Sequence, residues 1–285
     1  MNIELKNVDY IYNEGVVGEV YALKDINLKI KSHEIIGLIG QTGSGKSTLV
    51  QLLNGLLLPS HGDVIVDGIN TKDKDKRRDV RFKVGLVFQY PEHQLFEESI
   101  AKDIAFGPKN MKLSDDEIDR RVKASMEKVG LDYETYKDVS PFEISGGQQR
   151  RVAVAGIISM NPKVLVLDEL TAGLDPKGRE EIFSEIINIY NNDPELTIVL
   201  VSHSMEDVAE YVDRVVVLNK GEMFSDASTY DTFTKADLES IGLDIPQIAK
   251  FMRAYKAKGE DVRDDIYTID AAVAELSRHL GVSHE

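Results

Sequence analysis

The segment Ile35-Ile36-Gly37-Leu38-Ile39-Gly40-Gln41-Thr42-Gly43-Ser44-Gly45-Lys46-Ser47-Thr48 decides the fold of this 285-residue chain. Its first five residues are continuously apolar, which is typical of a strand covered on both faces, as in a parallel sheet. Residues 40–48 match the phosphate-binding loop pattern GxxxxGK[ST], and residues 49–53 after them have helical character. Strand, loop and helix therefore follow one another in the order that this pattern requires.

The residues of this loop suit a phosphate ligand. Glycines let several backbone N–H groups converge on phosphate oxygens, and the N-terminus of the next helix adds partial positive charge. We expect the Lys46 ammonium to reach the β- and γ-phosphates of a nucleotide and the Ser47 hydroxyl to bind Mg²⁺. The plainer alternative, a Gly/Ser turn without a ligand, is disfavoured by the flanking strand and helix. The predicted nucleotide-binding residues here are Gly40, Gln41, Thr42, Gly43, Ser44, Gly45, Lys46, Ser47 and Thr48.

Two further apolar runs, at 164–167 and 197–201, predict more buried strands, with helical patterns between them. This alternation indicates an α/β fold. The first run ends in Asp168-Glu169, at the end of a strand where ligands of open α/β sheets bind. Asp168 suits Mg²⁺ and Glu169 suits deprotonation of an attacking water. An apolar run ending in two acids is by itself more often structural, but its pairing with the phosphate-binding loop favours a catalytic role.

The segment Ile144-Ser145-Gly146-Gly147-Gln148 precedes a helical run at 149–160. It predicts a second helix N-terminus that can bind an anion. A Ser and two glycines at a helix N-terminus expose backbone donors to an anion. One nucleotide does not need two such loops from the same chain. This second loop is therefore predicted to serve a nucleotide held by another subunit.

The composition excludes several classes of protein. The chain has no Cys, which rules out disulfides, thiolate metal sites and Cys nucleophiles. Its 34 Lys and Arg against 49 Asp and Glu give a net charge of −15, which disfavours coating of nucleic acid. The apolar runs are far shorter than the roughly 18–20 residues of a membrane helix, and the N-terminus lacks a signal-peptide pattern. We expect an intracellular protein that does not cross a membrane by itself.

The rest of the chain divides by its pattern. Alternating residues at 3–8 and 26–30 predict N-terminal β-structure, and about 92–160 looks mostly helical. Ser114 and Glu117 have the spacing of a capping box ahead of a helix. Its predicted core stripe is Ile118, Val122, Met126 and Val129. Residues 226–285 predict a small helical extension, including a stripe of Ile269, Val273, Leu276 and Leu280, which could be a surface cap or a dimerisation or docking element.

In order and spacing, these segments resemble the nucleotide-binding subunits of ATP-binding-cassette (ABC) transporters over about residues 1–225. The resemblance implies an α/β P-loop NTPase core with a mostly parallel sheet, an N-terminal antiparallel β subdomain, an inserted helical subdomain at about 92–160 and a C-terminal helical appendage at 226–285. Residues 40–48 are similar to the Walker A loop, 164–169 to Walker B and 144–148 to the signature, with Ile144 in place of Leu. ATP and Mg²⁺ are the implied ligands.

The resemblance also assigns expected roles to single residues. Gln89 is similar to the Q-loop glutamine, which contacts Mg²⁺ and the attacking water, and Asp175 lies in a segment similar to the D-loop. His203 is similar to the switch histidine that contacts the γ-phosphate, and Tyr12 to the aromatic residue that stacks on adenine, with Tyr10 as a competitor. The implied catalytic residues are Glu169, His203 and Gln89; the implied metal ligands are Ser47, Gln89 and Asp168; the implied contacts to a partner's nucleotide are Ser145, Gly146, Gly147 and Gln148.

The segments 89–96 and 103–108 narrow the resemblance to the ATPases of energy-coupling-factor transporters, and more to the second of the two paired ATPases than to the first. This implies a heterodimer with a second homologous ATPase, an integral membrane scaffold (T) subunit and a substrate-binding membrane (S) subunit that captures vitamins or related micronutrients. The implied location is peripheral, at the cytoplasmic face of the cell membrane, with no nucleic-acid partner. The alternatives are the ATPase of another ABC importer, including the cobalt or nickel type, or a soluble ABC ATPase outside transport.

A basic cluster precedes Gln89. Its members between 72 and 83 are Lys72, Lys74, Lys76, Arg77, Arg78, Arg81 and Lys83. Such runs are usually solvated surface, and the alternative is contact with anionic lipid or with the scaffold.

Overall fold

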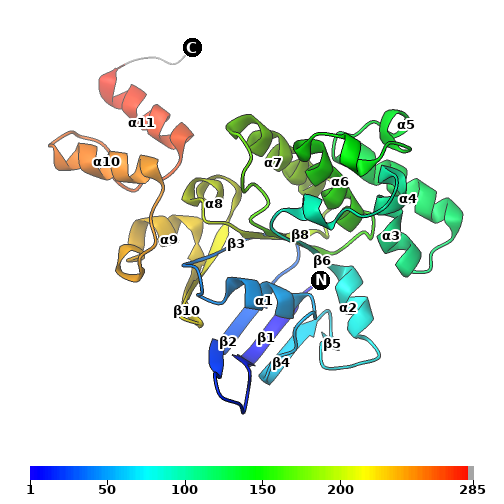
Figure 1. Cartoon of the computed structure of the whole chain (residues 1–285). Helices are drawn as coiled ribbons and strands as arrows, with labels where there is room; N and C mark the ends of the chain where they lie inside the picture. Colours follow the sequence, from blue (N-terminus) through cyan, green and yellow to red (C-terminus); the bar gives the residue numbers. More distant parts are fainter. Residues whose placement is uncertain (282–285) are drawn as a thin grey trace.

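The computed structural model describes residues 1–281 and contains two β-sheets (Figure 1). The larger sheet has six strands in the order β10-β9-β3-β8-β7-β6, of which all but β10 run parallel. These strands are β3 (Ile35–Gly40), β6 (Val84–Val87), β7 (Val164–Asp168), β8 (Thr197–Val201), β9 (Arg214–Asn219) and β10 (Glu222–Ser228). Every residue of β3, β6, β7 and β8 is buried, because helices or the second sheet cover both faces. The predicted parallel sheet is confirmed.

The smaller sheet is antiparallel and has the order β2-β1-β4-β5. Its strands are β1 (Ile3–Tyr12), β2 (Val20–Ile30), β4 (His61–Val66) and β5 (Ile69–Asn70). Helix α1 (Lys46–Leu53) and the inner faces of both sheets share one hydrophobic core, in which Ile26, Leu49 and Val166 are fully buried. The expected N-terminal antiparallel subdomain is therefore present, and it packs against the helix that follows the phosphate-binding loop.

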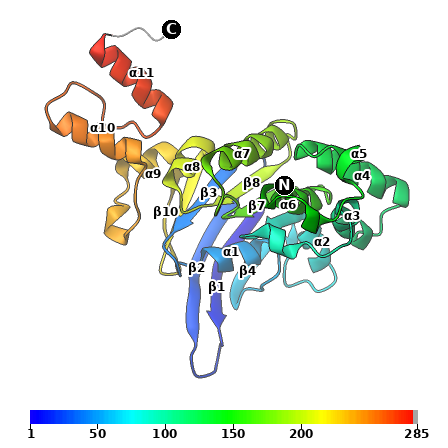
Figure 2. The ribbon, with the colours of Figure 1, turned by 45° about the horizontal axis from the view of Figure 1, so that its top comes forward.

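Helices cover the other face of the large sheet and form a layer beside it (Figures 1 and 2). Their bounds are α2 (Arg77–Lys83), η1 (Pro91–Gln94), α3 (Ile100–Asn110), α4 (Asp115–Lys128), α5 (Tyr133–Tyr136), η2 (Pro141–Glu143), α6 (Gly146–Ile158), α7 (Pro176–Asn191) and α8 (Met205–Tyr211). Helices α3, α4 and α6 contact one another and form the helical region expected at about 92–160. Within residues 1–281, no helix is both long enough and apolar enough to cross a bilayer.

The start of helix α4 differs from the prediction. Its N-cap Ser114 makes no capping hydrogen bond through its side chain. Glu117 instead forms ion pairs with Arg120 and Arg121, which lie three and four positions further along the helix. The predicted capping box is therefore wrong, because these two guanidinium groups bind the carboxylate that the box would use. The predicted core stripe is confirmed, since its four members are at most 5% exposed.

The C-terminal region has two parts. Helix α9 (Thr229–Lys235), the loop that follows the short helix η3 (Glu239–Ile241) and the start of α10 (Gln247–Ala257) pack into the main core through Phe233, Leu243, Ile245 and Ala249. The rest of α10 and α11 (Ile269–Leu280) enclose a separate small core of Met252, Val262, Ile266 and Ala272. Both views show α10 and α11 projecting from the body of the molecule (Figures 1 and 2).

Most of the predicted apolar stripe on α11 is exposed. Ile269 is 68% and Leu280 is 64% exposed, whereas Ala272 is buried. Glu275 is also buried, because its carboxylate binds Arg278 and the backbone N–H of Arg263. The apolar spacing therefore predicted the helix correctly, and of the stripe only Leu276 packs against the small core.

The basic cluster at 72–83 is largely engaged within the chain. Lys72 and Lys83 form ion pairs with Asp63 and Asp67, and Arg77 donates to the carbonyl of Thr71. Arg78 and Arg81 donate to the carbonyls of Asn110 and Gly55. For these five side chains, the contacts favour the interpretation as ordinary surface residues over contact with anionic lipid or with the scaffold. They fasten α2 and its flanking loops to the neighbouring elements.

The assignment of α9 to the main core is testable. Phe233→Ala should lower the free energy of unfolding of the whole chain by about 3–5 kcal/mol, because it removes a fully buried ring. Phe251→Ala is the matched control, since that ring is 47% exposed on α10. The two variants would be compared by denaturant unfolding monitored by far-UV circular dichroism. Equal effects of the two substitutions would contradict the assignment.

Candidate active site

The carboxyl ends of four parallel strands form the edge at which the predicted site residues gather. The phosphate-binding loop follows β3, Gln89 follows β6, Asp168 and Glu169 end β7, and His203 follows β8. Strand β7 lies between β6 and β8, with Val87 paired to Leu167 and Asp168 paired to Val201. Continued two positions, the β6–β7 register places Gln89 beside Glu169. On the other side the β7–β8 register places Ser202 beside Glu169, and His203 is the next residue, so Gln89 and His203 come from the two neighbouring strands.

Glu169 is the centre of a short polar network. Its carboxylate accepts a hydrogen bond from Gln89 Nε2 at 2.9 Å, and its other oxygen lies 2.9 Å from His203 Nε2. Glu169 has φ of 52°, a left-handed conformation that costs energy for a residue with a Cβ. Hydrogen bonds from Glu169 N to Val201 O and from Ala172 N to Glu169 O, each 3.0 Å, hold this turn. The strand thus ends abruptly with the Glu169 side chain between the two neighbouring strand ends.

The phosphate-binding loop can close only because of its glycines. A Cβ at Gly40 would lie 2.4 Å from Leu218 O, and one at Gly45, where φ is 105°, would lie 2.6 Å from Ala22 O. Lys46 is 6% exposed, and its Nζ donates to Gly40 O at 2.7 Å and Gln41 O at 3.1 Å. Burial lowers the pKa of Lys46, and the nearby carboxylates of Glu169 and Asp168 act against that shift. The loop therefore curls around a buried ammonium group.

Three features of this loop fit a nucleotide phosphate with a divalent cation. The N-terminus of α1 has no side-chain cap, so the donors of its first turn point toward a ligand position. The buried Ser44 Oγ has no partner within the described residues 1–281. Ser47 is exposed on the first turn of α1, whereas Asp168 is buried. Burial and the charge of Glu169 raise the pKa of Asp168, so a cation beside it would relieve an unfavourable pair of carboxylates.

Tyr12 lies beside the same helix start. Its hydroxyl is 3.2 Å from Thr48 Oγ1 and its ring is 40% exposed. Tyr10 packs edge-on against Tyr12, with ring centroids 4.8 Å apart, and is half-buried against the core between the sheets. Of the two aromatic candidates, Tyr12 is therefore the one with an open face next to the loop.

The signature segment lies at the start of α6, in the helical layer. Ser145 caps this helix and forms a complete capping box with Gln148, whose Nε2 also donates to Tyr136 Oη at 2.9 Å. Gly146 and Gly147 are exposed, and a Cβ at either would meet no atom within 4 Å. Among residues 1–281, no hydrogen bond joins this segment to the phosphate-binding loop. The structure thus leaves the two glycines open to another molecule.

Asp175 has a structural contact that the sequence did not predict. Its side chain accepts a 2.7 Å hydrogen bond from Gly178 N and caps helix α7. Asp175 is exposed at the end of the turn that begins at Glu169. It is not joined to Gln89, Glu169 or His203 by a hydrogen bond in the described part of the chain.

Arg150 is a residue of this region that sequence reasoning missed. It lies on α6 and is 4% exposed. Its guanidinium makes a bidentate ion pair with the Glu92 carboxylate, with N–O distances of 2.8 and 3.1 Å. It also donates to the carbonyls of Leu170 and Ala172 at 2.8 and 2.9 Å. Burial is the largest single influence and raises the pKa of Glu92, but the hydrogen bonds and charge of Arg150, a backbone hydrogen bond and the charge of His93 together lower it on balance. The sequence signal that could have indicated this role is that Arg150 is a charged residue at a position of helix α6 that otherwise suits the core.

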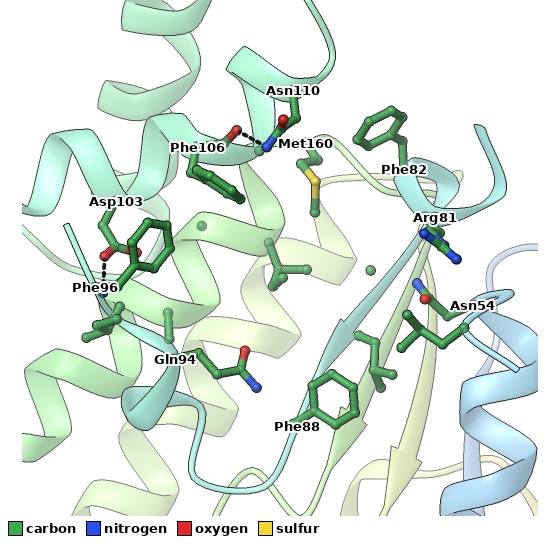
Figure 3. A pocket seen from close by; sticks show the side chains of 18 of the residues that line it. Asn54, Arg81, Phe82, Phe88, Gln94, Phe96, Asp103, Phe106, Asn110 and Met160 are labelled. Atoms are coloured by element: carbon green, nitrogen blue, oxygen red, sulfur yellow. Dashed lines mark hydrogen bonds between the residues drawn. The ribbon is translucent and has the colours of Figure 1, made fainter. Parts of the chain in front are cut away.

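A hollow of about 540 Å³ opens on the outer side of β6, beside the segment that follows Gln89. Figure 3 shows Phe82, Phe88, Phe96, Phe106 and Met160 around it. Phe96 and Phe106 stack edge-on at 5.0 Å and are 57% and 49% exposed. The hollow is therefore lined largely by apolar side chains, several of which are open to solvent.

This architecture, with a phosphate-binding loop, a strand-end carboxylate pair and a second helix-start loop, is that of an ABC-type ATPase. The ABC transporter family model matches residues 23–172. A solved structure of cbiO1 from Clostridium perfringens, described as part of the ABC transporter complex cbiONQ, matches with a TM-score of 0.74 and 36% identity over 88% of this chain and 98% of that one. The dimeric ATP-binding cassette MJ0796, bound to ADP and Pi, matches with a TM-score of 0.69 and 32% identity over 80% of this chain and 98% of that one.

Curated proteins are similar over nearly the whole length. The energy-coupling factor transporter ATP-binding protein EcfA2 of Clostridium perfringens is 54% identical over 97% of this chain and 97% of that protein. The protein of the same name from Clostridioides difficile is 51% identical over 97% and 96%. The chain belongs to the ABC transporter family and, within it, to the ATP-binding proteins of energy-coupling factor transporters. It is an ATPase, and the prediction of the second of the paired subunits is confirmed by the name these relatives share.

The Arg150–Glu92 pair generates a prediction about stability. Arg150→Met should lower the free energy of unfolding by about 3–5 kcal/mol, because it leaves a poorly solvated carboxylate and two carbonyls without their donor. Denaturant unfolding at pH 7 would measure the loss. The control is Arg120→Met, which breaks an exposed pair with Glu117 and should change stability far less. A loss no larger than that of the control would show that the buried pair contributes little.

Proposed function

We propose that this chain binds Mg²⁺–ATP at residues 40–48 and hydrolyses it in a site completed by the signature loop of a second, homologous ATPase. The observation that supports this most directly is the bridge of Gln89, Glu169 and His203 beside the buried Lys46. In this proposal the cycle drives an energy-coupling factor transporter that takes up vitamins or related micronutrients. The proposal rests on the family and on the geometry at the sheet edge.

ATP would be held by three kinds of contact. The backbone donors at the start of α1 and the Lys46 ammonium would bind the β- and γ-phosphates. Lys46 would exchange its present acceptors, the carbonyls of Gly40 and Gln41, for phosphate oxygens. The open face of Tyr12 would stack on adenine.

Glu169 is the proposed general base. Its position between Gln89 and His203 would hold the carboxylate toward a water in line with the γ-phosphate. His203 would contact the γ-phosphate, and Gln89 would orient the water. Ser47, Asp168 and Gln89 are the groups that would hold Mg²⁺, which when bound neutralises charge on the phosphate oxygens.

The signature loop is proposed to act on the partner's nucleotide. Ser145, Gly146 and Gly147 present the N-terminus of α6, and the two glycines have open space around them. Their backbone donors would close over a γ-phosphate held by the second ATPase, with Gln148 holding the helix start and Asp175 lying at the interface. ATP in both sites would favour the closed dimer and ADP would not.

The aromatic hollow beside β6 is the proposed docking site for the membrane scaffold (T) subunit, which in turn carries the substrate-binding (S) subunit. It is apolar, and it adjoins the segment that follows Gln89, so docking there could respond to the nucleotide. This arrangement places the chain peripherally at the cytoplasmic face of the cell membrane. It assigns no nucleic-acid partner, in keeping with the net charge of −15.

The role of Glu169 can be tested by substitution. Glu169→Gln should retain ATP binding but lower turnover at this site by about 10²-fold or more, because the amide cannot accept the proton. Turnover would be measured in the purified complex with the corresponding change also made in the partner ATPase. Glu180→Gln, on the exposed face of α7, is the control. Near-normal hydrolysis by the Glu169 variant would refute the assignment of the base.

The docking site generates a separate prediction. Phe96→Glu should weaken recovery of the membrane subunits with this chain, because a charge would be buried against an apolar partner. Phe251→Glu, at an aromatic residue of similar exposure on α10, should leave recovery unchanged. Affinity purification from detergent-solubilised membranes would measure both. If Phe96→Glu retains the membrane subunits as fully as the control, docking occurs elsewhere.

A further inference from the structure

The C-terminal segment 238–245 contacts the phosphate-binding loop directly. Gln41 Nε2 donates a 3.1 Å hydrogen bond to the carbonyl of Gly242, which lies 201 positions further along the chain. Leu238, Leu243 and Ile245 anchor this segment in the main core, with at most 9% of each side chain exposed. The contact therefore belongs to the body of the molecule and not to the projecting helices α10 and α11.

The same segment is fastened to the helix that follows His203. Gln247 N, in the first turn of α10, donates to Glu206 Oε1 at 3.2 Å, and Glu206 lies in the first turn of α8. A hollow of about 440 Å³ lies between these elements, lined by Gln41, Thr42, His203 and residues 242–244. The C-terminal segment thus forms a wall beside the phosphate-binding loop and beside His203, which is proposed to contact the γ-phosphate.

Gly242 permits this close approach. Its φ is 69°, and a Cβ there would lie 2.1 Å from Gln41 Nε2. That nitrogen is the end of a flexible side chain, so a larger residue would push the Gln41 side chain aside. Gly259 has a similar left-handed φ of 97°, but a Cβ there would meet no atom within 4 Å. Both glycines therefore have a left-handed backbone, but only Gly242 faces another side chain.

Gln41 is also part of the framework of the loop. Its carbonyl accepts from Lys46 Nζ and from Ser44 N, each at 3.1 Å. Fixing the Gln41 side chain at Gly242 restrains the loop backbone at Gln41, where the bond from Ser44 N would remain when Lys46 exchanges its acceptors for phosphate oxygens. A loop restrained in its binding conformation loses less entropy when it takes up a ligand.

We propose that segment 238–245 is a positioning element of the ATP site, with Gly242 as the residue that holds Gln41 and thereby the phosphate-binding loop. The inference rests on the proposed binding of ATP at residues 40–48. It gives the first part of the C-terminal extension a role in nucleotide affinity. A Gly242 that only ends helix η3 would affect stability without affecting ATP.

The test compares Gly242→Ala with Gly259→Ala in the purified full-length chain. Both introduce a Cβ at a left-handed residue, so both should lower the melting temperature. Gly242→Ala alone should weaken ATP binding, by about three- to tenfold, the effect of losing one hydrogen bond. Displacement of a fluorescent ATP analogue by Mg²⁺–ATP would measure affinity. Equal ATP affinities of the two variants would overturn the proposal.

A second substitution removes most of the backbone strain. Asn tolerates left-handed φ better than Ala, so Gly242→Asn tests the steric contact if Gly242→Ala fails to fold. In a Gln41→Ala background, the same change at Gly242 should weaken ATP binding less than twofold further, because its target is gone. An undiminished loss in that background would overturn the proposed route through Gln41.

Lys46→Ala separates this inference from the one on which it depends. If Lys46→Ala binds ATP as the wild type does, the loop is not the ATP site and both proposals fail. If Lys46→Ala loses binding while Gly242→Ala matches Gly259→Ala, only the positioning role fails. Loss of binding in Lys46→Ala together with the selective effect of Gly242→Ala supports both.

Discussion

The order of strands in the parallel sheet is the constraint on which the active site depends. Because β7 lies between β6 and β8, the residues beyond those three strands meet at one edge, and Glu169 lies between Gln89 and His203. Parallel strands also require long crossovers, and these carry the remaining parts of the site. One crossover, between β6 and β7, contains helices α3 to α6 and the signature loop. The longest connection between strands of the sheet therefore carries the surface proposed to meet the partner ATPase.

Electrostatics at this edge explain how a chain with a net charge of −15 can bind a polyphosphate. Two carboxylates, Asp168 and Glu169, lie near the single buried ammonium of Lys46. The remaining attraction for phosphate comes from backbone N–H groups at the start of α1, which are close to the ligand and poorly screened. Local dipoles therefore outweigh a distant and solvated net charge.

Polar contacts join the separate parts of the molecule. Arg150 ties the signature helix to the turn after Glu169 and to Glu92, beside the aromatic hollow. At the opposite side of the site, Gln41 ties the phosphate-binding loop to the C-terminal segment. The active-site edge is thus linked to the proposed docking site for the scaffold subunit on one side and to the C-terminal extension on the other. Each link runs through one or two side chains.

The sequence alone determined the buried strands, the phosphate-binding loop, the carboxylate pair and the signature, because each is a local pattern of hydrophobicity or glycine with one dominant structural solution. It placed Gln89 and His203 only by resemblance, since strand order cannot be read from local pattern. Tertiary structure decided which charges pair. It moved Glu117 from a cap to two arginines, buried Arg150, left most of the apolar stripe of α11 exposed and brought Gly242 against Gln41. These outcomes depend on competition among partners distant in sequence, and that competition exists only once the chain has folded.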